Sequence, residues 1–341
     1  MRTPVSLAVA GLGERGTSLL RAFDDIGSAE VRWLCDQSPA AGLRGSRRAP
    51  YARVTTRFDD LLEDETLDAV VIATPAPARA DLVRRALDAG KHVLVPPPLS
   101  LDAGEADDLL HRAESGNRRL VACNQLHFHP AAARLRELVA DGHLGEVLYL
   151  YGSRRALGSG DESVLWGAGA EAVAAVLWLV GDEPVEAFAR GGPCRGEGAD
   201  VAFCGLRFAT GIEAELRLSR VEPEPAQRLT VVGARATATL DVLDVAHPLT
   251  IHETAEDADG APCRGDVVAP RLPAGDPVRA LCEHFLAAVA APGVASGRGG
   301  AAVVGVLEAL QRSLERGGTR EAIGAPGEPI AGVIRLPIRS A

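Results

Sequence analysis

Lysine is almost absent from this chain of 341 residues. Arginine supplies nearly all of its basic side chains, and Lys91 is the single lysine. A mechanism that needs a lysine ammonium at any other position is therefore excluded. Cysteine is sparse too: the six cysteines form no Cys-x-x-Cys pair and have no histidine nearby at zinc-finger spacing. We expect them to be reduced, buried residues, and we predict no metal site.

Long apolar runs are also missing. No stretch approaches eighteen uncharged apolar residues, and the N-terminus has no basic segment followed by an apolar core and a small-residue cleavage site. The net charge of -10 opposes binding to phosphate backbones, which depends on clustered lysine and arginine. These absences predict a cytoplasmic protein that has neither a membrane nor a nucleic acid as a partner.

The remaining composition is that of an ordinary globular protein. Hydrophobic residues make up 47% and charged residues 24% of the chain, which excludes a disordered or collagen-like protein. At about 150 residues per domain, the length predicts two domains, with one large domain plus an extension as the alternative. The pattern of apolar segments changes near residue 124, so we place the domains at residues 1–123 and 124–341.

The first domain alternates between apolar strands and amphipathic helices. A strand at 5–10, a helix at 17–26 and a strand at 31–35 form a βαβ unit, and the alternation continues to residue 123. Such alternation predicts an α/β domain built on a doubly wound parallel sheet with helices on both faces.

The second domain is richer in strands. Short β-rich segments run from 147 to 241 between glycine, proline or charged turns, whereas 253–275 and 291–300 are predicted as loops. Helices are predicted at 130–140, 171–179, 277–290 and 301–315. We expect an α+β domain whose mainly antiparallel open sheet has helices on one face. The other face needs cover from water or from another chain, and we predict a homo-oligomer.

A glycine motif follows the first strand directly and opens the first helix. The first glycine of such a motif permits the tight turn, the second lets the backbone approach a pyrophosphate, and the third lets the helix pack against the strand. The helix N-terminus then offers N–H groups to the anion. The motif predicts dinucleotide binding, with a simple glycine-rich turn as the alternative. Its residues are Gly11, Leu12, Gly13, Glu14, Arg15 and Gly16, which match G-x-G-x-x-G.

Asp36 ends the second strand, 25 residues after Gly11. A carboxylate there can accept hydrogen bonds from both ribose hydroxyls and repels the 2'-phosphate of NADP, so Asp36 favours NAD as the cofactor. NADP stays open, because one of the arginines that follow is a candidate to reach that phosphate. They are Arg44, Arg47, Arg48, Arg53 and Arg57.

Thr74 and Pro75 end the next strand of the parallel sheet. Ligands of open α/β sheets bind at this edge, so the two residues either line the nicotinamide side of the cofactor or form a simple strand-ending turn.

Several segments taken in order resemble one protein family. They run from residue 5 to about residue 190 and resemble the Gfo/Idh/MocA family of NAD(P)-dependent oxidoreductases, which act on sugars, inositols and related polyols. The resemblance implies a Rossmann domain, a C-terminal α/β domain whose open sheet often mediates dimers or tetramers, and a small sugar-like substrate. The segments are GLGERG, VVIATP, ALDAGKHVL, LHFHP, DGHLGEV and VLWLVGDEPVEA.

Three customary catalytic side chains of that family are missing here. After GKHVL the family typically carries Glu-Lys-Pro, with the lysine bonded to the reacting hydroxyl or carbonyl, whereas this chain has three prolines. Pro97 therefore occupies the lysine position, beside the cofactor. Gly167 aligns with the family's Asp and Glu171 with its His. Losing one positioned acid or base typically costs roughly 10²- to 10⁴-fold in rate, and Lys91 lies at the far end of the sheet.

Other groups must then move the proton. Glu171 is the first candidate base, and a solvated carboxylate at a helix start is the alternative. His127 is the second candidate and His129 the third, with structural hydrogen-bonding histidines as the alternative. Arg154 and Arg155 either bind a carboxylate or phosphate or are surface arginines.

Three functions remain open. The first is an oxidoreductase that acts on a sugar, cyclitol or related polyol or ketone with non-standard acid–base residues, and the intact glycine motif supports it. The second is a catalytically silent member that binds NAD as a sensor or partner subunit. The third is an NAD-dependent lyase or hydrolase, which the same losses weaken.

Overall fold

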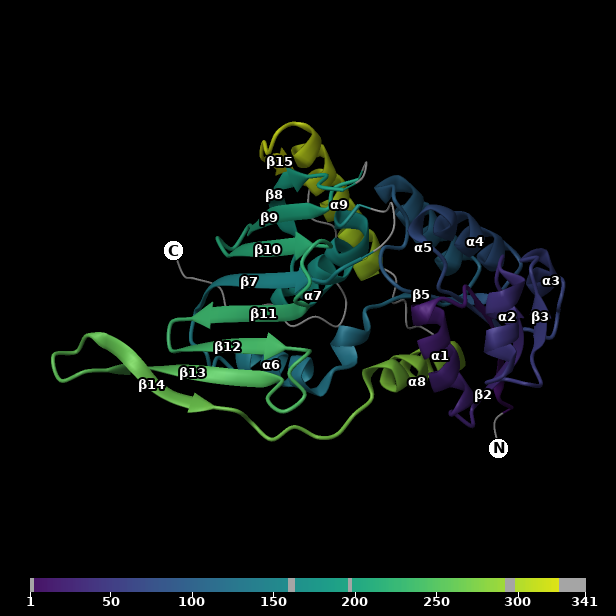
Figure 1. Ribbon diagram of the computed structural model, residues 1–341, viewed down its shortest axis with the longest axis horizontal. Coiled ribbons are helices and arrows are strands. Elements are labelled where there is room, and N and C mark those ends of the chain that lie inside the picture. The colour runs from purple at the N-terminus through teal and green to yellow at the C-terminus, as the bar shows by residue number, and fades with distance from the viewer. Residues whose placement is uncertain (1–2, 159–162, 196–197, 292–297, 325–341) are drawn as a thin grey trace. The chain divides into compact units, whose positions relative to one another are not determined.

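The chain divides into two compact units (Figure 1). The computed structural model describes residues 3–158, 163–195, 198–291 and 298–324. The first unit comprises Met1–Phe128 and Asp276–Val304, and the second comprises His129–Gly275 and Gly305–Ala341. The sequence places a single boundary between residues 123 and 124, whereas the chain returns to the first unit at Asp276.

The first unit contains a six-stranded, fully parallel sheet of order β3-β2-β1-β4-β5-β6. The chain runs outward from β1 to β3 and then in the opposite direction from β4 to β6, so right-handed crossovers place helices on both faces. The predicted doubly wound fold is confirmed. The strands are β1 (Val5–Ala10), β2 (Ala29–Cys35), β3 (Arg53–Thr55), β4 (Ala69–Ile72), β5 (His92–Val95) and β6 (Leu120–Ala122).

Helix α8 belongs to this unit although the sequence assigns it to the second domain. Its apolar face meets α1, and the rings of Phe285 and Phe23, both fully buried, pack edge to face with centroids 6.3 Å apart. Large buried aromatic rings contribute strongly to a core, which explains the return of the chain. The helices are α1 (Glu14–Asp24), α2 (Pro39–Ser46), α3 (Asp59–Leu62), α4 (Ala76–Asp88), α5 (Ala103–Ser115), the 3-10 turn η1 (Gln125–Phe128) and α8 (Pro277–Ala290).

The second unit is built on a nine-stranded sheet of order β14-β13-β12-β11-β7-β10-β9-β8-β15. Neighbouring strands are antiparallel except β7 and β10, which are parallel. The expectation of a mainly antiparallel sheet is therefore confirmed. The strands are β7 (Val147–Arg155), β8 (Pro184–Gly192), β9 (Val201–Phe208), β10 (Glu213–Ser219), β11 (Ala226–Gly233), β12 (Ala236–Asp241), β13 (Leu249–Glu256), β14 (Pro262–Val268) and β15 (Glu321–Ala322).

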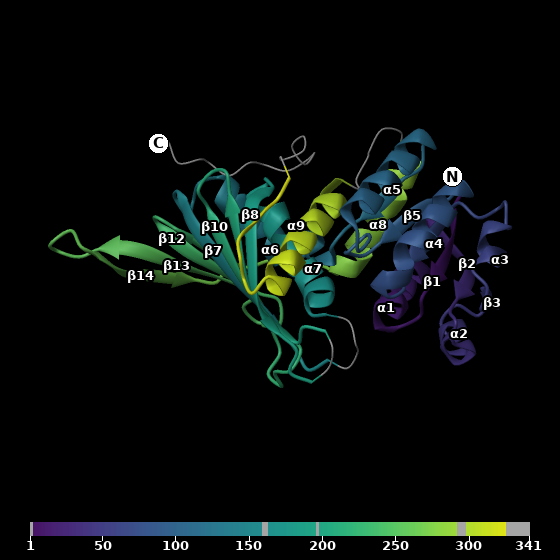
Figure 2. The same ribbon diagram turned by 90° about the horizontal axis from the view of Figure 1, so that it is seen from above.

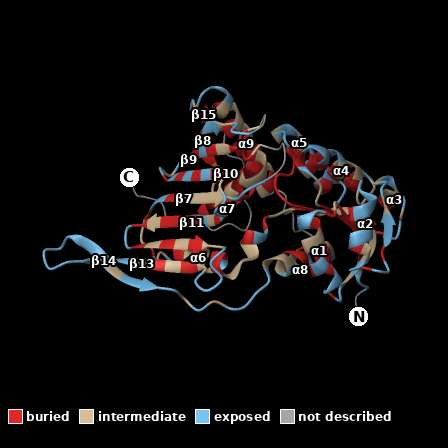
Figure 3. Ribbon diagram, in the orientation of Figure 1, coloured by how far each residue is buried: buried red, intermediate tan, exposed pale blue. Residues whose placement is uncertain are grey.

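Helices α6 (Pro130–Ala140) and α7 (Ala170–Val180) contact one face of this sheet (Figure 2). Burial alternates along β10 from Glu213 to Leu218 (Figure 3). The other face exposes apolar rings, among them Tyr149, Tyr151 and Phe203. The last described helix is α9 (Arg298–Glu315).

The loop predicted at 253–275 is wrong in part, because β13 and β14 form a hairpin there. Most residues of β14 are exposed (Figure 3). The strand is therefore held by pairing rather than by burial. Of the loop predicted at 291–300, residues 292–297 lie outside the described residues, and α9 begins at Arg298.

Candidate functional site

The glycine motif joins β1 to α1, and its glycines meet different constraints. Gly11 has a φ of +88°, and a Cβ on it would lie 2.7 Å from the Ala73 carbonyl carbon. A Cβ on Gly16 would lie 1.7 Å from the Gly11 carbonyl oxygen, so its absence lets α1 pack against the turn. A Cβ on Gly13 would meet no atom within 4 Å. Gly13 therefore borders open space directly before the N-terminus of α1.

Asp36 is tied to this loop through its carboxylate. Its Oδ2 accepts a hydrogen bond from the N–H of Leu12 at 2.7 Å, and its Oδ1 accepts one from the N–H of Ser38 at 2.8 Å. Each carboxylate oxygen has two lone pairs, and the side chain is only half-buried. Asp36 thus keeps acceptor capacity for ligand hydroxyls beside the glycine loop.

Three of the five arginines considered for a 2'-phosphate are engaged elsewhere. Arg48 and Arg57 form ion pairs with aspartates, and the guanidinium of Arg53 stacks over an indole ring. Arg44 and Arg47 are exposed. The Asp36 carboxylate, in contrast, is hydrogen-bonded to the glycine loop through the N–H of Leu12.

The turns after β4 and β5 lie at the same carboxyl edge of the sheet, because these strands pair in parallel. Thr74 follows β4, and its hydroxyl is buried without a hydrogen-bond partner among the described residues. Pro97 is buried in the turn after β5. A buried hydroxyl without a partner is costly, so the Thr74 hydroxyl keeps an unused donor and acceptor in this turn.

Glu171 lies in the first turn of α7 and is buried rather than solvated. Its Oε2 lies 2.5 Å from Arg154 Nη2, on the neighbouring strand β7. Arg155 is ion-paired as well, at 2.6 Å from a glutamate oxygen. The residues just before α7, Leu165–Gly169, form a π-helical turn that includes Gly167. Such turns frequently occur at functional sites.

The two predicted histidines have different surroundings. His127 lies in η1 with its Nδ1 3.4 Å from Cys123 Sγ. Burial raises the pKa of the Cys123 thiol to about 12, so the thiol stays protonated at neutral pH. His129 is the N-cap of α6, where its Nδ1 accepts a hydrogen bond from the N–H of Ala131 at 3.2 Å. This capping contact supports a structural role for His129 and leaves His127 as the histidine candidate.

Lys91 lies directly before β5, at the amino end of the sheet, and is buried. Its Nζ donates to the carbonyl oxygens of Asp64 at 2.7 Å and Leu67 at 2.9 Å. The desolvation that accompanies burial lowers its pKa. These contacts give the lysine a structural role far from the glycine loop.

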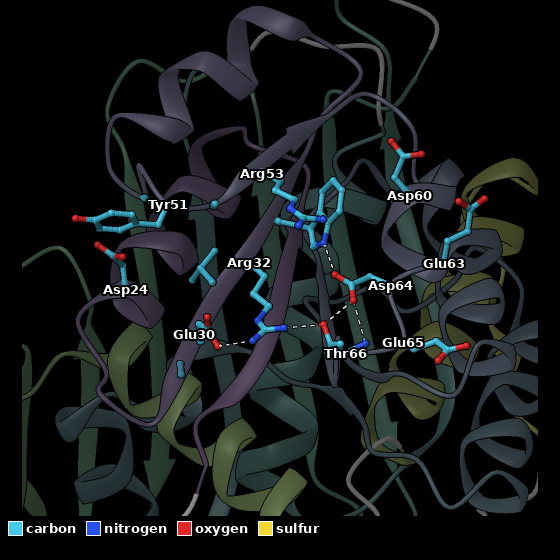
Figure 4. Close-up of a pocket in the computed structure, with 15 residues that line it drawn as sticks. Asp24, Glu30, Arg32, Tyr51, Arg53, Asp60, Glu63, Asp64, Glu65 and Thr66 are labelled. Carbon is cyan, nitrogen blue, oxygen red and sulfur yellow. Dashed lines mark hydrogen bonds and ion pairs between the residues drawn. The ribbon is translucent and has the colours of Figure 1, made fainter.

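A hollow of about 1190 Å³ opens at the amino end of β2 (Figure 4). Its polar side chains bond one another: Arg32 contacts Glu30 and Thr66, and Trp33 Nε1 donates to Asp64. Hydrogen bonds from Thr66 and Trp33 lower the pKa of Asp64 to about 2. The hollow lies at the end of β2 opposite the glycine motif and is a separate feature.

Neither a membrane span nor a metal cluster occurs in the part of the chain that the structure describes. None of its helices is long and apolar enough to cross a membrane. None of its His, Cys, Asp and Glu side chains gather in a group of three or more that could hold a metal ion.

Both units match known domains. Residues 5–124 match the family model described as an oxidoreductase family with an NAD-binding Rossmann fold. Residues 132–239 match the model of the Gfo/Idh/MocA C-terminal domain. The glycine motif, Asp36, Thr74 and Pro97 lie within the first match, whereas Arg154 and Glu171 lie within the second and the two histidines lie between the matches.

Two sequence relatives and one solved structure bear on the chemistry. A UDP-N-acetylglucosamine 3-dehydrogenase of Acidithiobacillus ferrooxidans is 32% identical over 274 residues, which are 77% of this chain and 85% of that protein. A solved structure of UDP-N-acetylglucosamine 3-dehydrogenase GnnA from the same species has a TM-score of 0.79 and 26% identity, covering 92% of this chain and 99% of its own. A 2,7-anhydro-N-acetylneuraminate hydratase of Escherichia coli is 23% identical over 281 residues, 75% of each chain.

Proposed function

Because the chain belongs to the Gfo/Idh/MocA oxidoreductase family, we propose that it transfers hydride between NAD and a sugar, cyclitol or related polyol or ketone. The observation that carries this proposal is the Asp36 carboxylate, fixed on the N–H of Leu12 beside the open space at Gly13. A carboxylate at this place accepts hydrogen bonds from ribose hydroxyls and disfavours a 2'-phosphate.

The cofactor site that we propose spans the carboxyl edge of the first sheet. The glycine motif, from Gly11 to Gly16, would hold the pyrophosphate at the N-terminus of α1. Asp36 would accept hydrogen bonds from the adenosine ribose, and Thr74, Pro75 and Pro97 would line the nicotinamide side. NAD, when bound, supplies the hydride acceptor, so the protein has to position the substrate and move one proton.

The substrate class follows from the relatives rather than from a pocket. The relative and the solved structure from Acidithiobacillus ferrooxidans are both named UDP-N-acetylglucosamine 3-dehydrogenase, and UDP-N-acetylglucosamine is a nucleotide sugar. Their names support a sugar-like substrate with an oxidisable secondary hydroxyl. These names give no information about which residues of this chain transfer the proton.

The proton route that we propose uses Glu171 or His127. Pro97 and Gly167, which take the positions of the family's Lys and Asp, have no ionisable side chain. Glu171 is placed by its ion pair with Arg154, and His127 by its contact with Cys123. Each candidate therefore has a neighbour that orients it.

Two other functions compete with this one. A lyase or hydrolase that uses tightly held NAD is favoured by the similarity to a hydratase. A catalytically silent NAD-binding sensor or partner subunit is favoured by Pro97 and Gly167. Both alternatives keep the cofactor site. They differ from the proposed dehydrogenase because neither produces a net transfer of hydride between NAD and the substrate.

Calorimetric titration with NADH and NADPH tests the cofactor site. We expect NADH to bind, with Asp36→Ala weakening NADH and reducing the preference over NADPH. Binding of neither nucleotide to the unmodified protein would refute the dinucleotide site. A clear preference for NADPH would reverse only the role of Asp36.

A further inference from the structure

Arg79, in the first turn of α4, is a buried arginine outside every site predicted from the sequence. Its Nε and Nη2 donate to the Thr74 carbonyl oxygen at 3.2 and 2.7 Å. Its Nη1 donates to the carbonyl oxygens of Pro96 at 3.1 Å and Pro98 at 2.5 Å. One guanidinium thus joins the turn after β4 to the turn after β5.

The three consecutive prolines explain why these turns need an arginine. Proline has no N–H, so Pro96–Pro98 cannot donate a backbone hydrogen bond to a neighbouring segment. The three prolines are buried, and buried carbonyl oxygens require donors. A guanidinium supplies several donors in one fixed plane, whereas a lysine ammonium is a compact charge on a flexible stem.

Arg79 holds only one side of the proposed cofactor site. In the sheet order β2-β1-β4-β5, the turns that it joins follow β4 and β5, whereas Asp36 ends β2, on the other side of β1. The Thr74 hydroxyl is buried without a partner in the described chain, and Pro97 lies between the two prolines whose carbonyls accept from Arg79. Arg79 is therefore placed to shape the nicotinamide side and not the adenosine side.

We propose that Arg79 is a positioning residue for the nicotinamide half of the cofactor. It fixes the Thr74 and Pro97 turns at the distance that lets them contact the ring, and the adenosine half binds without it. This inference rests on the proposed function, because it takes NAD as the ligand.

Two probes separate the halves of the cofactor. NADH carries the nicotinamide, and ADP-ribose lacks it but keeps the adenosine, the pyrophosphate and both ribose rings. We expect Arg79→Lys to raise the Kd for NADH by about tenfold or more and to change the Kd for ADP-ribose by less than about twofold, measured by calorimetry. Arg85→Lys is the matched control, because Arg85 is on the same helix and pairs with exposed carboxylates.

Equal weakening of both probes would assign Arg79 a purely structural role and overturn the proposal, and so would unchanged NADH binding. Failure of the unmodified protein to bind either probe would instead refute the proposed function.

A second measurement needs no variant and covers the case in which Arg79→Lys does not fold. In the unmodified protein, we expect NADH to slow amide hydrogen exchange at Thr74 and Leu99, on the two joined turns, more than ADP-ribose does. Both probes should slow exchange at Leu12 alike. If the two probes slow exchange at Thr74 and Leu99 equally, or neither does, the nicotinamide role of Arg79 is wrong.

Discussion

The ion pair between Glu171 and Arg154 is the best-defined charged contact near a predicted catalytic residue. Breaking a buried pair by removing one partner typically costs about 3–5 kcal/mol, because a charge is left without compensation. A test of Glu171 must therefore keep its shape. Glutamine does so, and it can still accept a hydrogen bond from Arg154 through its amide oxygen.

We expect Glu171→Gln or His127→Ala, or both, to lower kcat by roughly 10²-fold or more, since Pro97 and Gly167 supply no ionisable group. The measurement is NAD reduction with the substrate found by screening nucleotide sugars and polyols. His129→Ala is the control: it removes the α6 cap and should lower stability while leaving kcat unchanged.

Two outcomes would contradict this proton route. Full activity in both variants would leave solvent or the substrate itself as the base. Brisk oxidation of inositol or glucose by the unmodified protein would show that the loss of the customary Lys, Asp and His has been misjudged, because turnover of those substrates is expected near background.

Asp200 makes the free energy of unfolding depend on pH in the acidic range. Hydrogen bonds from the N–H of Cys194, the Arg220 guanidinium and the N–H of Arg195 lower its pKa to about 2. A carboxylate whose pKa is lowered by folding stabilises the protein above its unfolded pKa, near 3.9, and loses that contribution as pH falls through the folded value. The free energy of unfolding should therefore fall between about pH 4 and pH 2.

Urea unfolding at several pH values between 5 and 2 measures this dependence. Asp200→Asn should be less stable at pH 7 and show a smaller fall over the acidic range. An identical pH slope in both proteins would show that Asp200 does not control it.

At the scale of elements, five of the six strands of the first sheet could be predicted, whereas its short edge strand β3 and the edge of the second sheet could not. The central strands β1 and β4 are almost entirely apolar, and β4 is buried at every residue, so their pattern is local. In contrast, β14 contains Pro262, Gly265 and Asp266 and is exposed along most of its length. Such a sequence is typical of a loop, and only pairing with β13 makes it a strand.

The residues of the candidate site also fall into those that the sequence could predict and those that it could not. Gly13 and Asp36 follow from a strand–loop–helix pattern that is local in sequence. Arg79 does not, because its partners come from two turns brought together by sheet pairing. The sequence signal for the role of Arg79 was indirect. Three consecutive prolines remove three N–H donors, and their carbonyl oxygens need donors from elsewhere in the chain.

The start of α1 offers a matched pair of glycine substitutions. Gly13→Ala adds a methyl group to open space, so the melting temperature should stay nearly unchanged while NADH binding weakens. Gly16→Ala places its methyl 1.7 Å from a backbone oxygen, so the helix start must shift and the melting temperature should fall. Thermal unfolding and NADH titration of both variants check this contrast; unchanged NADH affinity in Gly13→Ala would place the pyrophosphate elsewhere.

At the scale of the whole molecule, one face of the second sheet exposes apolar rings in the described part of the chain. Tyr149 and Tyr151 are each 47% exposed and Phe203 is 51% exposed on this face, opposite the helices. Exposed apolar patches of this kind mark association sites. We therefore keep the prediction of a homo-oligomer that covers this face.

Light scattering at micromolar concentration should give a mass of at least two chains. Phe203→Glu should lower the mass towards that of one chain, because a carboxylate would be buried at the interface. Val245→Glu, at a residue that is 94% exposed in the turn before β13, is the control and should leave the mass unchanged. A strictly monomeric unmodified protein would contradict the prediction.

Lys91 gives this chain an internal reporter for chemical labelling. A reagent that acylates lysine has one side chain to modify, and in the folded first unit that amine is 4% exposed and held by two carbonyl oxygens. Acylation of Lys91 then requires the start of β5 to open, so its rate follows local or global unfolding of the first unit. The second unit contains no lysine, so the acylated fraction of the peptide that contains Lys91, measured by mass spectrometry, monitors the opening of the first unit alone.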